Sequence, residues 1–237
     1  MTGTYEHSID AKGRLFIPAK LREELGVTFY LAMGVDECLA IYPQETWNRF
    51  TEKFASLPMS QSAAMRPLFD DPAVIAVGEI GLDHHWPLPA QEQYDLFEAQ
   101  LQLAQELDLP VSVHDREAHA EMYELLRQYR PRGVLHCYSG SAEDAAWLTA
   151  QGMALGFGGA VTYKGAKRAA KVLAMVPHEL AVLETDCPYM SPEPVRGTRN
   201  DSRNIAHVAA KIGEIWQMDA QSVLDLTAEN AKRIFNQ

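Results

Sequence analysis

Four short apolar runs in the second part of the chain each carry a side chain that can bind a metal ion. They span residues 74–83, with Glu79, then 110–114, 133–136 and 180–186. Runs this short and rich in Val, Ile and Leu predict strands buried on both faces, as in parallel sheets. Burying a carboxylate without a partner or a metal is costly, so an acidic or imidazole group closing such a strand is a functional candidate.

The segments between these runs have helical periodicity. Helices are predicted at 91–108, 117–129, 142–151 and 164–175, a further strand at 153–157, and a helical C-terminal region at 202–216, 219–226 and 228–235. Alternation of strands and helices predicts an α/β fold with a parallel sheet and right-handed crossovers. Five strands are predicted for this sheet.

The first 69 residues follow a different pattern. Two alternating segments, 5–9 and 14–17, flank the turn-forming sequence Asp-Ala-Lys-Gly at 10–13. Asp and Gly favour a hairpin turn, because Gly accepts positive φ and Asp bonds its own backbone. A short helix at 19–25, strands at 29–33 and 38–42 and a helix from 43 to about 54 complete a small α+β unit.

Charge divides the chain in the same way. The formal net charge of the 237 residues is −11, of which residues 1–69 carry −1 and residues 70–237 carry −10. We therefore predict a boundary between residues 69 and 70. The three cysteines are odd in number and widely spaced, which argues against a disulfide framework. The absence of a signal-peptide pattern and of a membrane-length apolar run favours a cytoplasmic protein without a membrane partner.

The N-terminal part resembles a known family of regulators. The sequence Asp-Ala-Lys-Gly-Arg at 10–14, the following Leu-Phe-Ile-Pro-Ala-Lys-Leu-Arg-Glu and the Leu-Ala-Ile-Tyr-Pro at 39–43 are similar to the first half of MraZ proteins. The resemblance implies an AbrB-like (SpoVT-AbrB) swapped-hairpin half-domain over residues 1–69, homo-oligomer formation through it, and nucleoid association. It also implies that Lys12 and Arg14 contact operator DNA. The alternative is that both residues only solvate a hairpin, since one basic pair neutralises few phosphates.

The C-terminal part resembles a second family. The motifs are Gly-Glu-Ile-Gly-Leu-Asp (78–83), His-Asp-Arg-Glu-Ala (114–118), His-Cys-Tyr-Ser-Gly (136–140), Gly-Phe-Gly-Gly (156–159), Glu-Thr-Asp-Cys-Pro-Tyr (184–189) and Arg-Gly-Thr-Arg-Asn (196–200). They resemble the TatD family of metal-dependent deoxyribonucleases, which are TIM barrels of the amidohydrolase-like kind. The resemblance covers residues 70–237 and implies hydrolysis of DNA phosphodiester bonds.

The resemblance also implies a ligand set. Glu79 would be the carboxylate shared between two metals, His114 and His136 would ligate one of them, and Asp186 would ligate the other and handle a proton. Glu79 and Asp186 are thus the predicted catalytic residues. Imidazole and carboxylate groups suit zinc, manganese or magnesium.

The family's first strand bears a His-x-His pair, and no such pair occurs in this sequence. The predicted fold is therefore a truncated TIM-type (β/α) barrel, preceded by the half-domain described above. With that pair missing, we expect one metal site rather than two, and impaired activity.

Three interpretations of function follow. The first is a TatD-like hydrolase with DNA as its substrate. The second is an MraZ-like transcriptional regulator with DNA as its operator. The third is a recombined chain without a selected function. Metal-dependent cleavage of DNA supports the first, whereas salt-sensitive binding of promoter DNA that depends on Arg14 supports the second.

Overall fold

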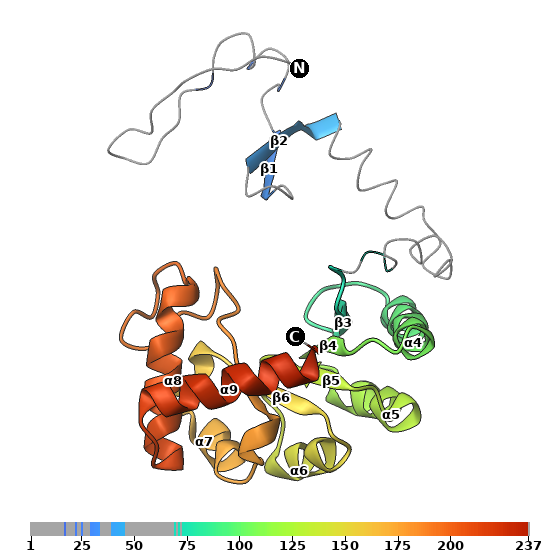
Figure 1. Cartoon of the computed structure of the whole chain (residues 1–237). Coiled ribbons are helices and arrows are strands. Elements are labelled where there is room, and N and C mark those ends of the chain that lie inside the picture. Colours follow the sequence, from blue (N-terminus) through green and yellow to red (C-terminus); the bar gives the residue numbers. More distant parts are fainter. Residues whose placement is uncertain are drawn as a thin grey trace. The chain divides into compact units, whose positions relative to one another are not determined.

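A computed structural model describes residues 17, 22, 25, 29–33, 39–45, 69, 71 and 73–236 (Figure 1). The chain divides into two compact units, Met1–Gln61 and Ser62–Gln237. In the first unit, the two predicted strands are present as β1 (Phe29–Met33) and β2 (Leu39–Pro43), and they pair antiparallel. The predicted hairpin with Lys12 and Arg14 lies outside the described residues, and the boundary between residues 69 and 70 stays a prediction.

The second unit is built on the predicted parallel sheet of five strands. These are β3 (Val77–Asp83), β4 (Val111–Arg116), β5 (Gly133–Leu135), β6 (Ala154–Phe157) and β7 (Ala181–Leu183), hydrogen-bonded in that order. The connections contain α4 (Ala90–Glu106), α5 (His119–Tyr129), α6 (Ala142–Ala150), the 3-10 helix η2 (Gly159–Thr162), α7 (Lys167–Leu173) and the 3-10 helix η3 (His178–Leu180). Because neighbouring strands are parallel, each connection carries the chain from the carboxyl ends of the strands back to their amino ends.

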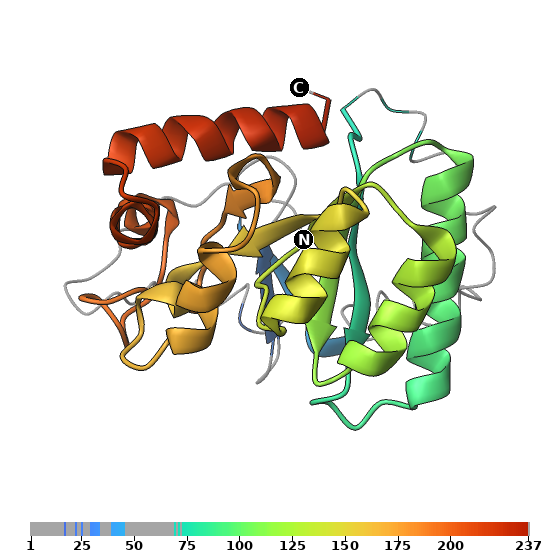
Figure 2. The ribbon, with the colours of Figure 1, turned by 90° about the horizontal axis from the view of Figure 1, so that it is seen from below.

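After β7 a long loop leads to the 3-10 helix η4 (Ser202–Asn204) and the helices α8 (Ile205–Trp216) and α9 (Ala220–Ile234). Helix α9 is continuous, so the expectation of two helices at 219–226 and 228–235 is wrong. Thr227 lies inside this helix, where its buried hydroxyl donates a hydrogen bond to the Val223 carbonyl oxygen at 2.8 Å and is thus satisfied without ending the helix. In Figures 1 and 2, α9 lies apart from α4 and α5, which lie side by side.

The two faces of the sheet have different roles. Alternate residues of the strands pack against the helices and form the main core, which includes Val111, Val113, Leu135, Leu155 and Phe157 from the strands and Phe97, Leu101, Met122, Leu125 and Leu148 from the helices. The residues between them face the other way. On that inner face, Val134, Ala154 and Val182 form a small buried cluster with Ile234 of α9.

This alternation places the polar site. His136 lies two residues after Val134, and Glu184 lies two residues after Val182, so both point from the inner face at the carboxyl edge of the sheet. Parallel barrel-type sheets place their chemistry at this edge. No helix in the described part of the chain combines the length and the hydrophobicity that a membrane span requires.

Candidate metal centre

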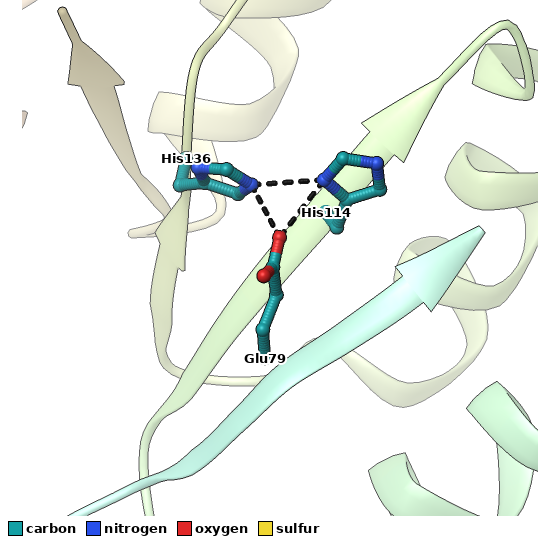
Figure 3. A group of neighbouring side chains, drawn as sticks. All are labelled: Glu79, His114 and His136. Atoms are coloured by element: carbon teal, nitrogen blue, oxygen red, sulfur yellow. Dashed lines mark hydrogen bonds and ion pairs between the residues drawn. The ribbon is translucent and has the colours of Figure 1, made fainter. Parts of the chain in front are cut away.

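Three of the predicted site residues meet at the carboxyl edge of the sheet (Figure 3). The Glu79 Oε1 atom lies 2.6 Å from His136 Nε2 and 2.9 Å from His114 Nδ1. The two imidazole nitrogens are 3.0 Å apart. Each residue comes from a different strand or strand end, β3, β4 and β5, so the order of strands in the sheet brings them together.

Glu79 reaches this position through an irregularity in β3. Gly78 is paired with Ser112 and Ile80 with Val113, so Glu79 has no partner in β4. An extra residue of this kind is a β-bulge, and it redirects a side chain. The expectation of a buried carboxylate closing its strand is wrong for Glu79, which is the third residue of β3 and has a side chain that is 54% exposed.

A second carboxylate stands behind each imidazole. Asp83 Oδ2 lies 3.3 Å from His114 Nε2, and Glu184 Oε2 lies 3.7 Å from His136 Nδ1. A carboxylate there favours a proton on the nitrogen that faces it. The nitrogens that face Glu79, Nδ1 of His114 and Nε2 of His136, are thereby left with lone pairs for a ligand.

Glu184 is a site residue that the sequence reasoning missed. The backbone N–H of Cys137 donates a hydrogen bond to its Oε1 atom at 2.5 Å. The neighbouring strand makes room for the side chain with glycine, because a Cβ atom at Gly156 would lie only 2.7 Å from Glu184 Oε2. The sequence feature that could have identified Glu184 is its position directly after β7. Two residues after Val182, its side chain points to the same face of the sheet as that of Val182.

Replacing Glu184 by Gln is expected to weaken divalent-metal binding by about 10- to 100-fold. If the amide oxygen keeps the hydrogen bond from Cys137, the amide NH₂ group faces His136 Nδ1 and donates to it. That forces the His136 proton onto Nε2, which points at Glu79. Titration of the metal-free protein with zinc measures the loss, and the far-UV circular dichroism spectrum should stay unchanged. Equal affinity of the Gln variant and the parent would contradict the role of Glu184 in orienting His136.

Electrostatics in the site favour protons when no cation is bound. Burial alone would lower the pKa of His136, but its bond to Glu184 and the charges of Glu184, Glu79 and Asp186 raise it above the ordinary value. The pKa of the Asp186 carboxyl is raised by burial and by repulsion from Glu184 and Glu79, against the attraction of both histidines. A divalent ion would therefore compete with protons, and its affinity should fall as the pH falls.

Asp186 lies near the three-residue cluster without belonging to it. Its carboxylate acts electrostatically on His136, and it is not a member of the close group formed by Glu79, His114 and His136. Its backbone oxygen accepts a hydrogen bond from the Tyr189 N–H at 2.9 Å, which starts the loop after β7. A second close group consists of His136, Cys137 and Glu184, and there the pKa of the Cys137 thiol is raised by burial and by Glu184.

The Glu79, His114 and His136 cluster suits a divalent cation. Two imidazoles and a carboxylate are ligands for zinc, manganese or iron-type ions. Adjacent ligands of an octahedral ion are about 3 Å apart when each lies about 2.1 Å from it, and the three atoms here are 2.6 to 3.0 Å apart. A cavity of about 390 Å³, lined by residues that include Glu79, Asp83, Gln93 and His114, adjoins the cluster.

A parallel sheet with this cluster at its carboxyl edge is typical of barrel-type metal-dependent hydrolases. Comparison with known proteins specifies the family. The family model of TatD-related DNases matches residues 23–236, and the chain belongs to this family. The matched range includes part of the segment that resembles MraZ proteins, and the MraZ resemblance stays a prediction.

Similar proteins agree with this assignment. The chain is 39% identical over 166 residues to the uncharacterized metal-dependent hydrolase YabD of Bacillus subtilis, covering 68% of this chain and 65% of YabD. It is 35% identical over 188 residues to the 3'-5' ssDNA/RNA exonuclease TatD of Edwardsiella piscicida, covering 74% and 71%. The crystal structure of the TatD homolog YjjV from Escherichia coli superposes with a TM-score of 0.67 at 33% identity, covering 76% and 69%. The chain thus spans about two thirds of the length of such relatives.

Proposed function

We propose that this protein is a metal-dependent hydrolase that cleaves phosphodiester bonds of single-stranded nucleic acid with one divalent ion. The convergence of Glu79, His114 and His136 on one point carries this proposal. The name of the Edwardsiella relative, a 3'-5' exonuclease of single-stranded DNA and RNA, supports the choice of substrate.

The residues of the site have two proposed roles, binding the ion and transferring a proton. Glu79, His114 and His136 would hold the ion, and Asp83 and Glu184 would keep the imidazoles oriented. A bound divalent ion supplies Lewis acidity at a phosphoryl oxygen and lowers the pKa of a nearby water. Asp186 would accept the proton of the attacking water, as the water oxygen bonds to phosphorus and the bond from phosphorus to the leaving ester oxygen breaks.

One ion is proposed because these 237 residues contain no His-x-His pair. The resemblance to TatD proteins implies that such a pair contributes ligands to a second ion. Two ions can stabilise both the attacking and the leaving oxygen, whereas one ion stabilises them less completely. We therefore propose activity well below that of relatives with both sites.

Stripping the protein with a chelator should abolish cleavage of a labelled single-stranded oligonucleotide. Adding back zinc, manganese or magnesium, each alone, should restore it with at least one of these ions. Release of labelled nucleotides on a denaturing gel is the measurement. Cleavage that persists after chelation, or no cleavage with any of the three ions, would contradict the proposed function.

A further inference from the structure

The motif at residues 196–200 has no part in the metal centre, yet the structure folds it back toward that centre. Asn200 is 2% exposed, and its side-chain NH₂ group donates hydrogen bonds of 2.7 Å to the carbonyl oxygens of Thr185 and Tyr189. Asn200 thus ties the end of the loop after β7 to the start of the same loop, next to Asp186.

Arg196 in this loop is held by an aromatic ring. Its guanidinium carbon lies 4.0 Å from the centre of the Tyr163 ring, the distance of a cation–π contact. Tyr163 follows η2, whose preceding residue Gly158 lies against Glu184. A guanidinium stacked on a ring keeps its edge N–H groups free to donate, and that edge matches two phosphate oxygens.

The charge around this loop differs from that of the rest of the unit. Residues 161–203 contain seven Lys and Arg against five Asp and Glu, whereas the other residues of 70–237 contain seven against nineteen. Two of the five acids, Glu184 and Asp186, belong to the candidate site. Six exposed cations of the segment make no ion pair within the described part of the chain: Lys164, Lys167, Arg168, Lys171, Arg196 and Arg199.

The same loop presents an aromatic side chain to solvent. Tyr189 is 72% exposed, although its backbone is fixed by the hydrogen bonds from Asn200 and to Asp186. An exposed aromatic ring in the same loop as unpaired cations is the combination that binds single strands, since any base can stack on it.

We propose that the loop after β7 is the strand-binding element of this protein. Arg196, held on Tyr163, binds a backbone phosphate next to the bond at the metal centre, and Tyr189 stacks on a nearby base. This inference rests on the proposed function for its choice of ligand. The proposed ligand of the loop is a single-stranded nucleic acid. An acidic polypeptide is the alternative ligand, because it is also a polyanion.

Fluorescence anisotropy with a phosphorothioate-linked oligothymidylate, which resists hydrolysis, tests the proposal on the full-length protein with its metal. Arg196→Gln should weaken binding about tenfold and reduce the slope of log affinity against log salt by about 0.7, the value for one single-strand phosphate. Tyr189→Ala should weaken binding by a similar factor without changing the slope, and Tyr189→Phe should bind like the parent.

Arg127→Gln is the matched control. Arg127 also stacks on a ring, with its guanidinium 4.9 Å from the centre of the Trp147 ring, but it lies in the last turn of α5, toward the amino edge of the sheet. This substitution makes the same charge change and should leave affinity and slope unchanged. Arg196→Lys should recover the salt slope, which a purely structural role for Arg196 would not predict.

Two results would overturn the proposal. One is equal affinity of Arg196→Gln and Arg127→Gln for the oligonucleotide. The other is displacement of the oligonucleotide by polyglutamate as readily as by unlabelled oligothymidylate. Because binding is measured without cleavage, an inactive protein that still binds through Arg196 would refute the proposed function and leave this inference standing.

Discussion

His136→Ala is expected to lower divalent-metal affinity by more than about a hundredfold and to remove nucleic-acid cleavage. Loss of a residue that merely orients a ligand costs about 10- to 100-fold, and His136 would be a ligand itself. Its side chain is 15% exposed and lies between Glu79 and Glu184, so its removal would leave Glu79 and His114 as the two remaining ligands of the cluster. Metal content by mass spectrometry and cleavage of a labelled oligonucleotide measure both effects.

The matched control for this prediction is His207→Ala, which removes an imidazole from α8 that belongs to neither close group of potential metal ligands in the described residues. It should retain the metal and the activity of the parent. If His136→Ala and His207→Ala bind metal equally well, the three-residue cluster is not the metal centre.

Gly81→Ala is expected to lower the free energy of unfolding by about 3 to 5 kcal/mol. Gly81 has φ of +143°, and a Cβ atom there would lie 2.0 Å from the backbone oxygen of His114. Strand β3 would have to move away from β4, and this would also separate Glu79 from His114. Urea denaturation measures the loss of stability, and metal titration of the variant should show weakened binding.

Gly152→Ala separates the effect of crowding from that of backbone conformation. Gly152 also has positive φ, +85°, but no atom lies within 4 Å of its added Cβ. This substitution should cost only about 1 to 2 kcal/mol, the strain of a left-handed backbone in a residue with a side chain. Equal losses in both variants would contradict the close approach of β3 to β4 at Gly81.

The sheet could be predicted from the sequence because its strands are continuous apolar runs closed by polar groups. The strand at 153–157 and the helix at 142–151 agree with β6 and α6 to within a residue at each end. Parallel strands with sequential connections leave few arrangements, so the convergence of side chains at their carboxyl ends follows from the pattern.

The details of the site depend on features that no local pattern contains. The bulge that redirects Glu79 arises from the pairing of Gly78 and Ile80 with β4, and pairing is a long-range property. Glu184 serves His136 only because Gly156 in the next strand leaves space for it. Sequence reasoning identified the acid of the 184–189 motif as Asp186, whereas the structure places Glu184 closer to the imidazole and Asp186 beside the cluster.

Most predictions for the N-terminal part concern residues outside the described ones and therefore stay predictions. The pairing of β1 with β2 agrees with the predicted strands at 29–33 and 38–42. The DNA-contacting roles of Lys12 and Arg14, and assembly through residues 1–69, stay predictions. A salt-sensitive shift of promoter DNA that disappears in Arg14→Ala would support them.

Anomalous X-ray diffraction from crystals grown with zinc or manganese tests the central claim most directly. The predicted result is one strong anomalous peak within bonding distance of Glu79 Oε1, His114 Nδ1 and His136 Nε2. A peak that avoids these three atoms, or two fully occupied ions at the carboxyl edge of the sheet, would contradict the single centre proposed here.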